Sequence, residues 1–103
     1  MYDLEYLPTA RRDMVDIVGY ISRELHNPAA AQQLAAELIE AAEQLREFPY
    51  AAPAYIPLRP LQREYRKLLV RNYLMFYWVN ENQKQITVAR VIYARRDHGA
   101  LLD

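Results

Sequence analysis

The stretch that decides the fold lies in the last third of the chain. It reads EYRKLLVRNYLMFYWV at residues 64–79 and ITVARVIYARRDH at residues 86–98. Both segments are rich in β-branched and aromatic residues, which favour strands. Arg71 and Asn72 suit a tight turn because asparagine tolerates positive φ, and residues 81–84 suit a second turn. The pattern predicts an antiparallel meander of three strands, at about residues 63–70, 73–80 and 85–93.

The middle strand of this meander is apolar on both faces. Alternate side chains of a strand point to opposite faces, so one face receives Tyr73, Met75, Tyr77 and Val79, and the other receives Leu74, Phe76 and Trp78. A strand buried on both faces is usually central in its sheet. We therefore expect one face to pack against helices and the other to form a partly apolar, aromatic concavity.

The first half of the chain predicts one strand and two helices. Residues 2–6 alternate apolar and polar side chains, as a short strand does. Apolar residues then recur at helical spacing over about residues 9–26 and 28–47, with Pro8 and Pro28 suited to the helix starts. Four prolines within residues 48–62 predict an ordered surface connection. The expected fold class is α+β: an N-terminal strand, a two-helix hairpin and a meander, in one domain of residues 1–103.

Composition excludes several classes of protein. The 103 residues suffice for one domain and include no cysteine, which excludes disulfide and thiolate chemistry. The longest apolar run, residues 73–79, is far shorter than the roughly 20 residues of a membrane helix, and no secretion signal is visible. We expect a cytoplasmic protein that does not enter a membrane. With two glycines and no metal-ligand spacing, we expect neither a cofactor nor a metal.

Charge is divided unequally along a chain whose net charge is zero. Residues 1–50 hold four Arg and nine acids, a net charge of −5, whereas residues 51–103 hold nine Lys or Arg and four acids, a net charge of +5. Such asymmetry indicates an anionic partner for the basic half. The alternative is that the two halves only balance one another within the fold.

Basic and aromatic side chains of the meander form the candidate functional surface. Arg66 and Lys67 are neighbours on one strand and point to opposite faces, whereas Arg95 and Arg96 follow the last strand. Cations beside aromatic rings suit a phosphate backbone with stacked bases. The alternative is a solvated sheet edge whose charges discourage aggregation. His98 suits a general acid in RNA cleavage, although a terminal histidine is more often simply solvated.

Several segments follow one another in a characteristic order. They are a strand, a proline-initiated helix, NPAAA at residues 27–31, FP at 48–49, YRKLLV at 65–70, NYLMFY at 72–77 and RVIYARRD at 90–97. Together they cover almost the whole chain, and their order resembles the RelE/ParE superfamily of bacterial type II toxins. The resemblance implies a curved antiparallel sheet with a helical hairpin packed against it. It also implies a partner, a cognate antitoxin whose flexible segment wraps the toxin and neutralises it.

The resemblance leaves two molecular targets open. RelE-like members cleave mRNA in the ribosomal A site without metal, whereas ParE-like members inhibit DNA gyrase and are not nucleases. Arg66 and Lys67 match the nucleases, but Leu74 stands where nucleases often carry an arginine. The basic cluster with His98 favours a ribosome-dependent endoribonuclease, our first hypothesis. Leu74 and the long hairpin favour gyrase inhibition, the second. A decayed toxin that only binds its antitoxin is the third.

The resemblance also suggests roles for individual residues. In a nuclease, Arg66, Lys67 and Arg95 would neutralise phosphate. His98 would protonate the leaving 5′-oxygen, and the 2′-hydroxyl of the RNA would be the nucleophile. Further RNA- or target-binding residues are expected at Arg63, Arg71, Arg90, Tyr93 and Arg96. The expected antitoxin-binding surface is the apolar face made by Leu74, Phe76 and Trp78.

Overall fold

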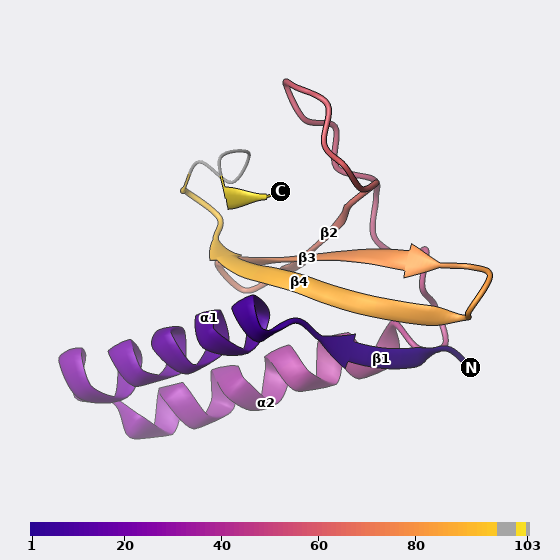
Figure 1. Ribbon diagram of the computed structural model, residues 1–103. Helices are drawn as coiled ribbons and strands as arrows, with labels where there is room; N and C mark the ends of the chain where they lie inside the picture. Colours follow the sequence, from indigo (N-terminus) through magenta and orange to yellow (C-terminus); the bar gives the residue numbers. More distant parts are fainter. Residues whose placement is uncertain (97–100, 103) are drawn as a thin grey trace.

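The computed structural model describes residues 1–96 and 101–102. Its elements are β1 (Asp3–Tyr6), α1 (Pro8–Gly19), a π-helical turn (Tyr20–Glu24), α2 (Pro28–Gln44), β2 (Arg66–Val70), β3 (Tyr73–Asn80) and β4 (Gln85–Tyr93). The four strands form one sheet, and the two helices lie side by side along one face of it (Figure 1). The expected α+β fold is confirmed.

The N-terminal strand joins the sheet beside the C-terminal strand. The strand order is β1-β4-β3-β2, and β1 runs parallel to β4 with Leu4 opposite Ile86. The pairs β2–β3 and β3–β4 are antiparallel, as the meander predicts. Parallel neighbours need a long connection, and here the helices and the first two strands of the meander supply it. The sheet is therefore mixed, with β3 in the expected central position.

Proline and asparagine set the starts of the two helices. Pro8 and Pro28 lie in the first turns of α1 and α2, and the Asn27 side chain caps α2 by accepting the Ala30 N–H at 3.1 Å. The helix expected over residues 9–26 is α-helical only to Gly19 and then continues as the π-helical turn. Apolar spacing does not reveal such a turn, because a π-helical turn still keeps apolar residues on one side. The second helix ends at Gln44, three residues earlier than expected.

The main core lies between the helices and the sheet. Met75 and Tyr77 of β3 and Val88 of β4 are buried there against Leu34 and Leu38 of α2. Burying apolar side chains of this size contributes about 1.5–3 kcal/mol each relative to exposure. The Tyr77 hydroxyl donates to the Pro49 carbonyl at 2.8 Å, so its polar end is paired inside the core. The expected packing of this face of β3 against the helices is therefore observed.

The opposite face of the sheet is covered by the chain itself. Leu74 and Phe76 are buried in a second cluster with Ile92, and Trp78 is partly buried at its margin. The cover comes from the connection and from the end of the chain, through Tyr55, Leu61, Leu101 and Leu102. We expected a partly apolar, aromatic concavity on this face, and Leu74 and Phe76 lie buried beneath this cover. An apolar sheet face of this size gains stability from burial, and the chain has enough apolar residues outside its elements to cover it.

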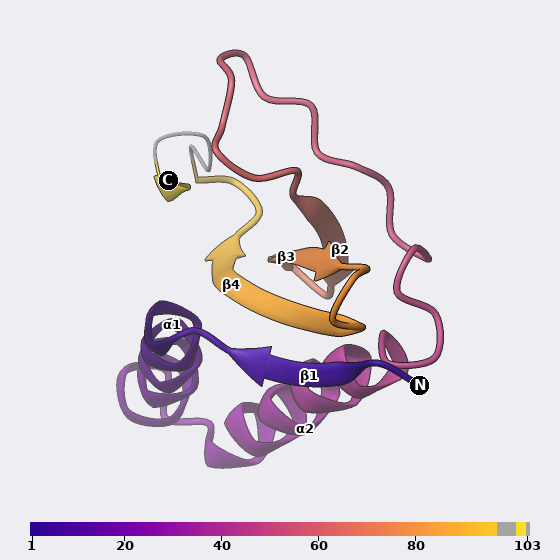
Figure 2. The ribbon, with the colours of Figure 1, turned by 45° about the vertical axis from the view of Figure 1, so that its right-hand side comes forward.

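The connection between α2 and β2 rises away from the sheet before it returns to β2 (Figure 2). On its way it pairs with the outer edge of β2, where the Lys67 N–H donates to the Pro53 carbonyl at 3.2 Å. The Tyr55 N–H donates to the Tyr65 carbonyl at 2.8 Å. The strand expected from residue 63 begins three residues later, at Arg66. Neither helix of the described chain is long and apolar enough to span a membrane.

Candidate functional site

The two adjacent cations of β2 both contact the connection. Arg66 donates from Nη1 to the Ala52 carbonyl at 2.8 Å, and its guanidinium lies 4.7 Å from the centre of the Tyr50 ring. Lys67 lies on the other face, with Nζ 5.5 Å from the centre of the Tyr55 ring. The opposite directions predicted from strand alternation are thus observed. Arg66 holds the connection against the sheet. Lys67 lies at the margin of the covered face, which is the sheet face opposite the helices.

Tyr50 also belongs to a cluster centred on Glu81, in the turn between β3 and β4. The Glu81 carboxylate accepts hydrogen bonds from the hydroxyls of Tyr2 and Tyr50 and from the Lys84 ammonium. These donors, with that of Lys84 the strongest influence, lower the pKa of Glu81 to about 2. The cluster joins the N-terminus, the connection and the β3–β4 turn, so Arg66 packs against a ring that is itself fixed.

Arg90 of β4 is held by Asp13 of α1. The Arg90 Nε and Nη2 atoms donate to the two Asp13 carboxylate oxygens at 2.7 and 3.0 Å, and Nη1 donates to the Leu101 carbonyl at 3.0 Å. Asp13 also accepts the Val91 backbone N–H at 3.0 Å. The hydrogen bond to Asp13 raises the pKa of Arg90 above its ordinary value. Only 22% of the Arg90 side chain is exposed, so this cation joins α1, β4 and the end of the chain.

Sequence reasoning missed Asp13 as the partner of Arg90. Asp13 lies three residues after Ala10 and four before Ile17, at the edge of the helical stripe that packs toward the sheet. A carboxylate at such a position requires a buried partner. That spacing was the available signal, but a single sequence does not identify which of the nine cations of the basic half is the partner.

Arg71 occupies the turn between β2 and β3 and pairs with α2. Its Nε and Nη2 atoms donate to the Glu37 carboxylate at 2.9 and 2.7 Å. These bonds raise the pKa of Arg71 and lower the pKa of Glu37. Arg71 has a φ of 54°, which is uncommon for a residue other than glycine. The predicted target-binding residue thus also ties the turn to the helix.

The remaining predicted residues lie on or beside the covered face. The Arg63 guanidinium lies 4.1 Å from the centre of the Trp78 ring. Tyr93 is exposed at the end of β4 and packs edge-on against Tyr73 at 5.7 Å. Arg95 and Arg96 are exposed, and their side chains make no hydrogen bond or ion pair with the described residues. His98 lies outside the residues that the structure describes.

Strand register separates the predicted catalytic cations. Lys67, Phe76 and Arg90 form one row across β2, β3 and β4, and Tyr93 closes another row three residues further along β4. The rows are therefore about 10 Å apart at 3.3 Å per residue, and β2 and β4 are separated by about 10 Å across the sheet. Arg95 follows Tyr93 by two residues. Lys67 and Arg90 thus share a row but lie two strands apart, and Arg95 lies beyond the end of β4.

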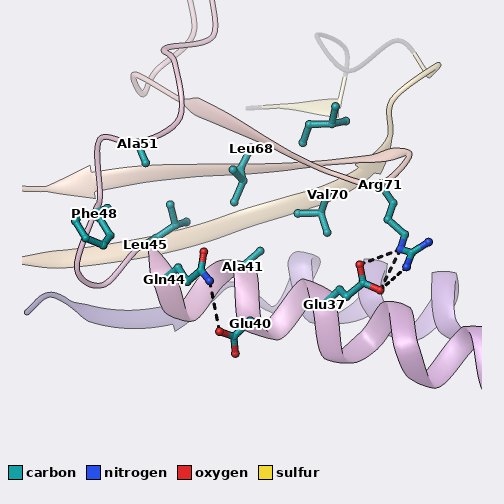
Figure 3. Close-up of a pocket in the computed structure, with 11 residues that line it drawn as sticks. Glu37, Glu40, Ala41, Gln44, Leu45, Phe48, Ala51, Leu68, Val70 and Arg71 are labelled. Carbon is teal, nitrogen blue, oxygen red and sulfur yellow. Dashed lines mark hydrogen bonds and ion pairs between the residues drawn. The ribbon is translucent and has the colours of Figure 1, made fainter.

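A groove between α2 and the edge strand β2 forms a candidate site separate from the predicted cations, and the sequence analysis did not predict it (Figure 3). Its volume is about 500 Å³. Leu45 and Ala41 line it from the helix, and Leu68 and Val70 line it from the strand. The Glu37–Arg71 ion pair closes one end, and Phe48 and Ala51 lie at the other. Within residues 1–96 and 101–102, no cluster of three His, Cys, Asp or Glu could hold a metal ion.

Comparisons with known proteins agree with the fold. A family model described as ParE toxin of type II toxin-antitoxin system, parDE, matches residues 4–98. No curated protein matches the chain. The chromosomal ParDE toxin-antitoxin system of P. aeruginosa contains a chain of similar structure, with 18% identity and a TM-score of 0.74, covering 92% of this chain and 98% of that chain.

Two RelBE structures are also similar. The RelBE2 toxin-antitoxin complex of Mycobacterium tuberculosis gives 19% identity and a TM-score of 0.65, covering 89% of this chain and 96% of that chain. The archaeal RelE-RelB complex of Pyrococcus horikoshii gives 15% identity and a TM-score of 0.61, covering 92% and 97%. These likenesses concern the fold, whereas the family model spans nearly the whole chain. The chain therefore belongs to the ParE toxin family of type II toxin-antitoxin systems.

Proposed function

We propose that this toxin acts by binding a protein target, DNA gyrase, and that a cognate antitoxin neutralises it in the cytoplasm. Sequence reasoning placed the ribosome-dependent endoribonuclease first. We place gyrase inhibition first here, and the contacts of Arg66, predicted as catalytic, and of Arg90, predicted as target-binding, support that choice. The target follows from the resemblance to ParE-like toxins, and the family match supports it. The antitoxin follows from the same family and from structural neighbours that are toxin-antitoxin complexes.

The proposal rests on one observation: two of the cations that a nuclease would direct at its RNA are already bound to other groups of this protein. Arg66 is bonded to Ala52 and stacked on Tyr50, and Arg90 is bonded to Asp13 and Leu101. Electrostatic catalysis needs charges aimed at the atoms where charge develops in the transition state. Releasing Arg90 toward an RNA would leave the Asp13 carboxylate partly buried without its cation, which is costly.

Leu74 supports the same conclusion. Its side chain is buried in the second core cluster, at the position where the nucleases of the superfamily often carry a cation. Moreover, the surface offers apolar side chains of the kind that protein interfaces use, including exposed Phe48, Ile56, Leu58 and Leu69. Binding to a protein uses such side chains, whereas phosphate chemistry does not.

One observation favours the nuclease as a second candidate. Arg63 stacks on Trp78 and Lys67 lies beside Tyr55, so two cations stand next to aromatic rings at the margin of the covered face. This is the side-chain combination that binds phosphate and unstacked bases of single-stranded RNA.

Induced expression separates the two candidates. We expect growth arrest with DNA breaks and intact translated transcripts for the wild-type chain. We expect the Lys67→Ala variant to remain as toxic as an Arg12→Ala control, which removes an exposed cation from α1. Codon-specific cuts in mRNA, lost in Lys67→Ala and kept in Arg12→Ala, would show that the toxin is a nuclease.

A further inference from the structure

The connection between α2 and β2 carries two apolar side chains in the part that lies furthest from the helices. Residues 56–60, here named the tip, lie between Tyr55 and Leu61, which both pack on the second core cluster. The tip projects beyond the sheet (Figures 1 and 2). Ile56 is 88% exposed and Leu58 is fully exposed, more than any other large apolar side chain of the described residues. The fold therefore leaves this apolar surface in water.

The base of the tip is fastened to the sheet. The Tyr55 N–H donates to the Tyr65 carbonyl at 2.8 Å, and the Lys67 N–H donates to the Pro53 carbonyl at 3.2 Å. The Tyr55 ring also packs edge-on against Phe76, with 5.3 Å between the ring centres. These contacts fix the start of the tip and keep its exposed side chains away from the core.

Prolines limit the motion of the tip itself. Pro57 and Pro60 each fix their own φ and restrict the residue that precedes them. A segment that is already held in one conformation loses little conformational entropy when it binds, so more of the contact energy appears as affinity. The tip thus has the properties of a preformed projection that inserts into a partner.

The shape and the charge of the tip define that partner. An apolar projection needs a concave apolar pocket that already exists, which a folded protein offers and a flexible segment does not. Residues 53–63 contain two arginines and no acidic residue, so the rim of the pocket should be acidic. A large folded enzyme is therefore a better occupant than the flexible segment of an antitoxin.

We propose that the tip inserts Ile56 and Leu58 into an apolar pocket of DNA gyrase. This inference rests on the proposed function, and it adds the element by which the toxin holds its target. The two apolar side chains form the buried centre of the interface, and Arg59 lies at its acidic rim. Such buried anchors carry most of the binding energy of a protein interface.

Substitutions at the tip test the insertion and leave the fold intact, because both side chains are exposed. Leu58→Ala truncates one anchor, and Leu58→Glu replaces it with a charge that an apolar pocket excludes. Val15→Ala and Val15→Glu are the matched controls, since Val15 is apolar and 69% exposed on α1. The probe is the purified gyrase holoenzyme with a linear DNA fragment. Affinity is measured by surface plasmon resonance, on variants whose melting temperature equals that of the wild type.

We expect Leu58→Ala and Ile56→Ala each to weaken gyrase binding by about tenfold or more, and Leu58→Glu by about a hundredfold. Both Val15 variants should stay within about threefold of the wild type. Wild-type affinity in all three tip variants would overturn the insertion and leave the proposed function intact. If the wild-type chain does not bind gyrase at all, the proposed function is wrong, and the partner inferred here falls with it.

Two further measurements test the other possible occupants. The tip variants should bind the full-length polypeptide encoded beside this chain's gene as tightly as the wild type does. Sedimentation velocity should show the same oligomeric state for Leu58→Glu and the wild type. Loss of antitoxin binding with gyrase affinity kept would assign the tip to the antitoxin. An assembly that Leu58→Glu dissociates, again with gyrase affinity kept, would assign the tip to a second copy. Either result would overturn the proposal.

Photo-cross-linking locates the contact independently of affinity. A benzophenone amino acid in place of Leu58 should cross-link to gyrase on irradiation, whereas the same amino acid in place of Val15 should not. A variant that binds gyrase but forms no cross-link from position 58 would contradict the insertion.

Discussion

Replacing Asp13 with alanine should destabilise this protein more than any surface substitution. The change removes two of the three acceptors of the Arg90 guanidinium, leaving the Leu101 carbonyl, and it removes the acceptor of the Val91 N–H. The Arg90 side chain, which is 22% exposed, then faces an alanine. In the wild type it faces the Asp13 carboxylate, which is 15% exposed. The contact between α1 and β4 then holds an unpaired charge, which costs far more than the loss of a surface ion pair.

The magnitude follows from this burial. Removing one partner of a fully buried pair costs about 3–5 kcal/mol. Because both side chains keep some solvent, we place Asp13→Ala at the lower end, about 3 kcal/mol, which for a domain of this size lowers the melting temperature by about 10–20 °C. Asp13→Asn should lose about half as much, since the amide oxygen still accepts one or two of the three hydrogen bonds.

Urea denaturation monitored by circular dichroism measures these differences, with Asp16→Ala as an exposed control on the same helix. The double variant Asp13→Ala/Arg90→Ala should be less destabilised than the sum of the two single variants by about 1–3 kcal/mol. Additive effects, or an Asp13→Ala variant within about 0.5 kcal/mol of the wild type, would refute the structural role given to this pair.

Three further predictions concern stability. The pKa of Glu81 is lowered to about 2, so its ionised form contributes stability that is present above pH 4.5 and lost as the pH falls toward 2. The melting temperature of Glu81→Gln should therefore depend less on pH over this range than that of the wild type. An unchanged pH profile would contradict this role of Glu81. Tyr77→Phe should cost about 1 kcal/mol in urea denaturation, because the Pro49 carbonyl loses its buried donor. Gly19→Ala should raise the melting temperature, because alanine loses less backbone conformational entropy on folding and the three atoms nearest the new methyl group all belong to the flexible end of Arg23. A clear decrease would show that Arg23 does not move.

Local patterns in the sequence were sufficient to predict most of the elements. The prolines and Asn27 located the helix starts, and the continuous apolar run of residues 73–79 identified the central strand. The parallel pairing of β1 with β4 was not predicted, because residues 3–6 and 85–88 are far apart in the chain and alternation does not specify a partner. The π-helical turn was missed because apolar spacing tolerates it.

The candidate site was harder to predict than the fold. Strand alternation placed Arg66 and Lys67 on opposite faces, which the structure shows. It did not indicate that Arg90 would find Asp13, or that the face of Leu74 and Phe76 would be covered by the connection and the end of the chain. Both depend on tertiary contacts between segments that are distant in the sequence. The groove beside Leu69 was missed for the same reason, since its walls come from α2 and β2.

A DNA supercoiling assay with purified gyrase tests the proposed activity most directly. The purified chain should inhibit supercoiling and leave gyrase trapped on cleaved DNA, and prior addition of the antitoxin should prevent both effects. The same preparation should leave mRNA intact on translating ribosomes. Full supercoiling activity in the presence of the chain, together with codon-specific cleavage of that mRNA, would contradict a toxin that acts by binding gyrase.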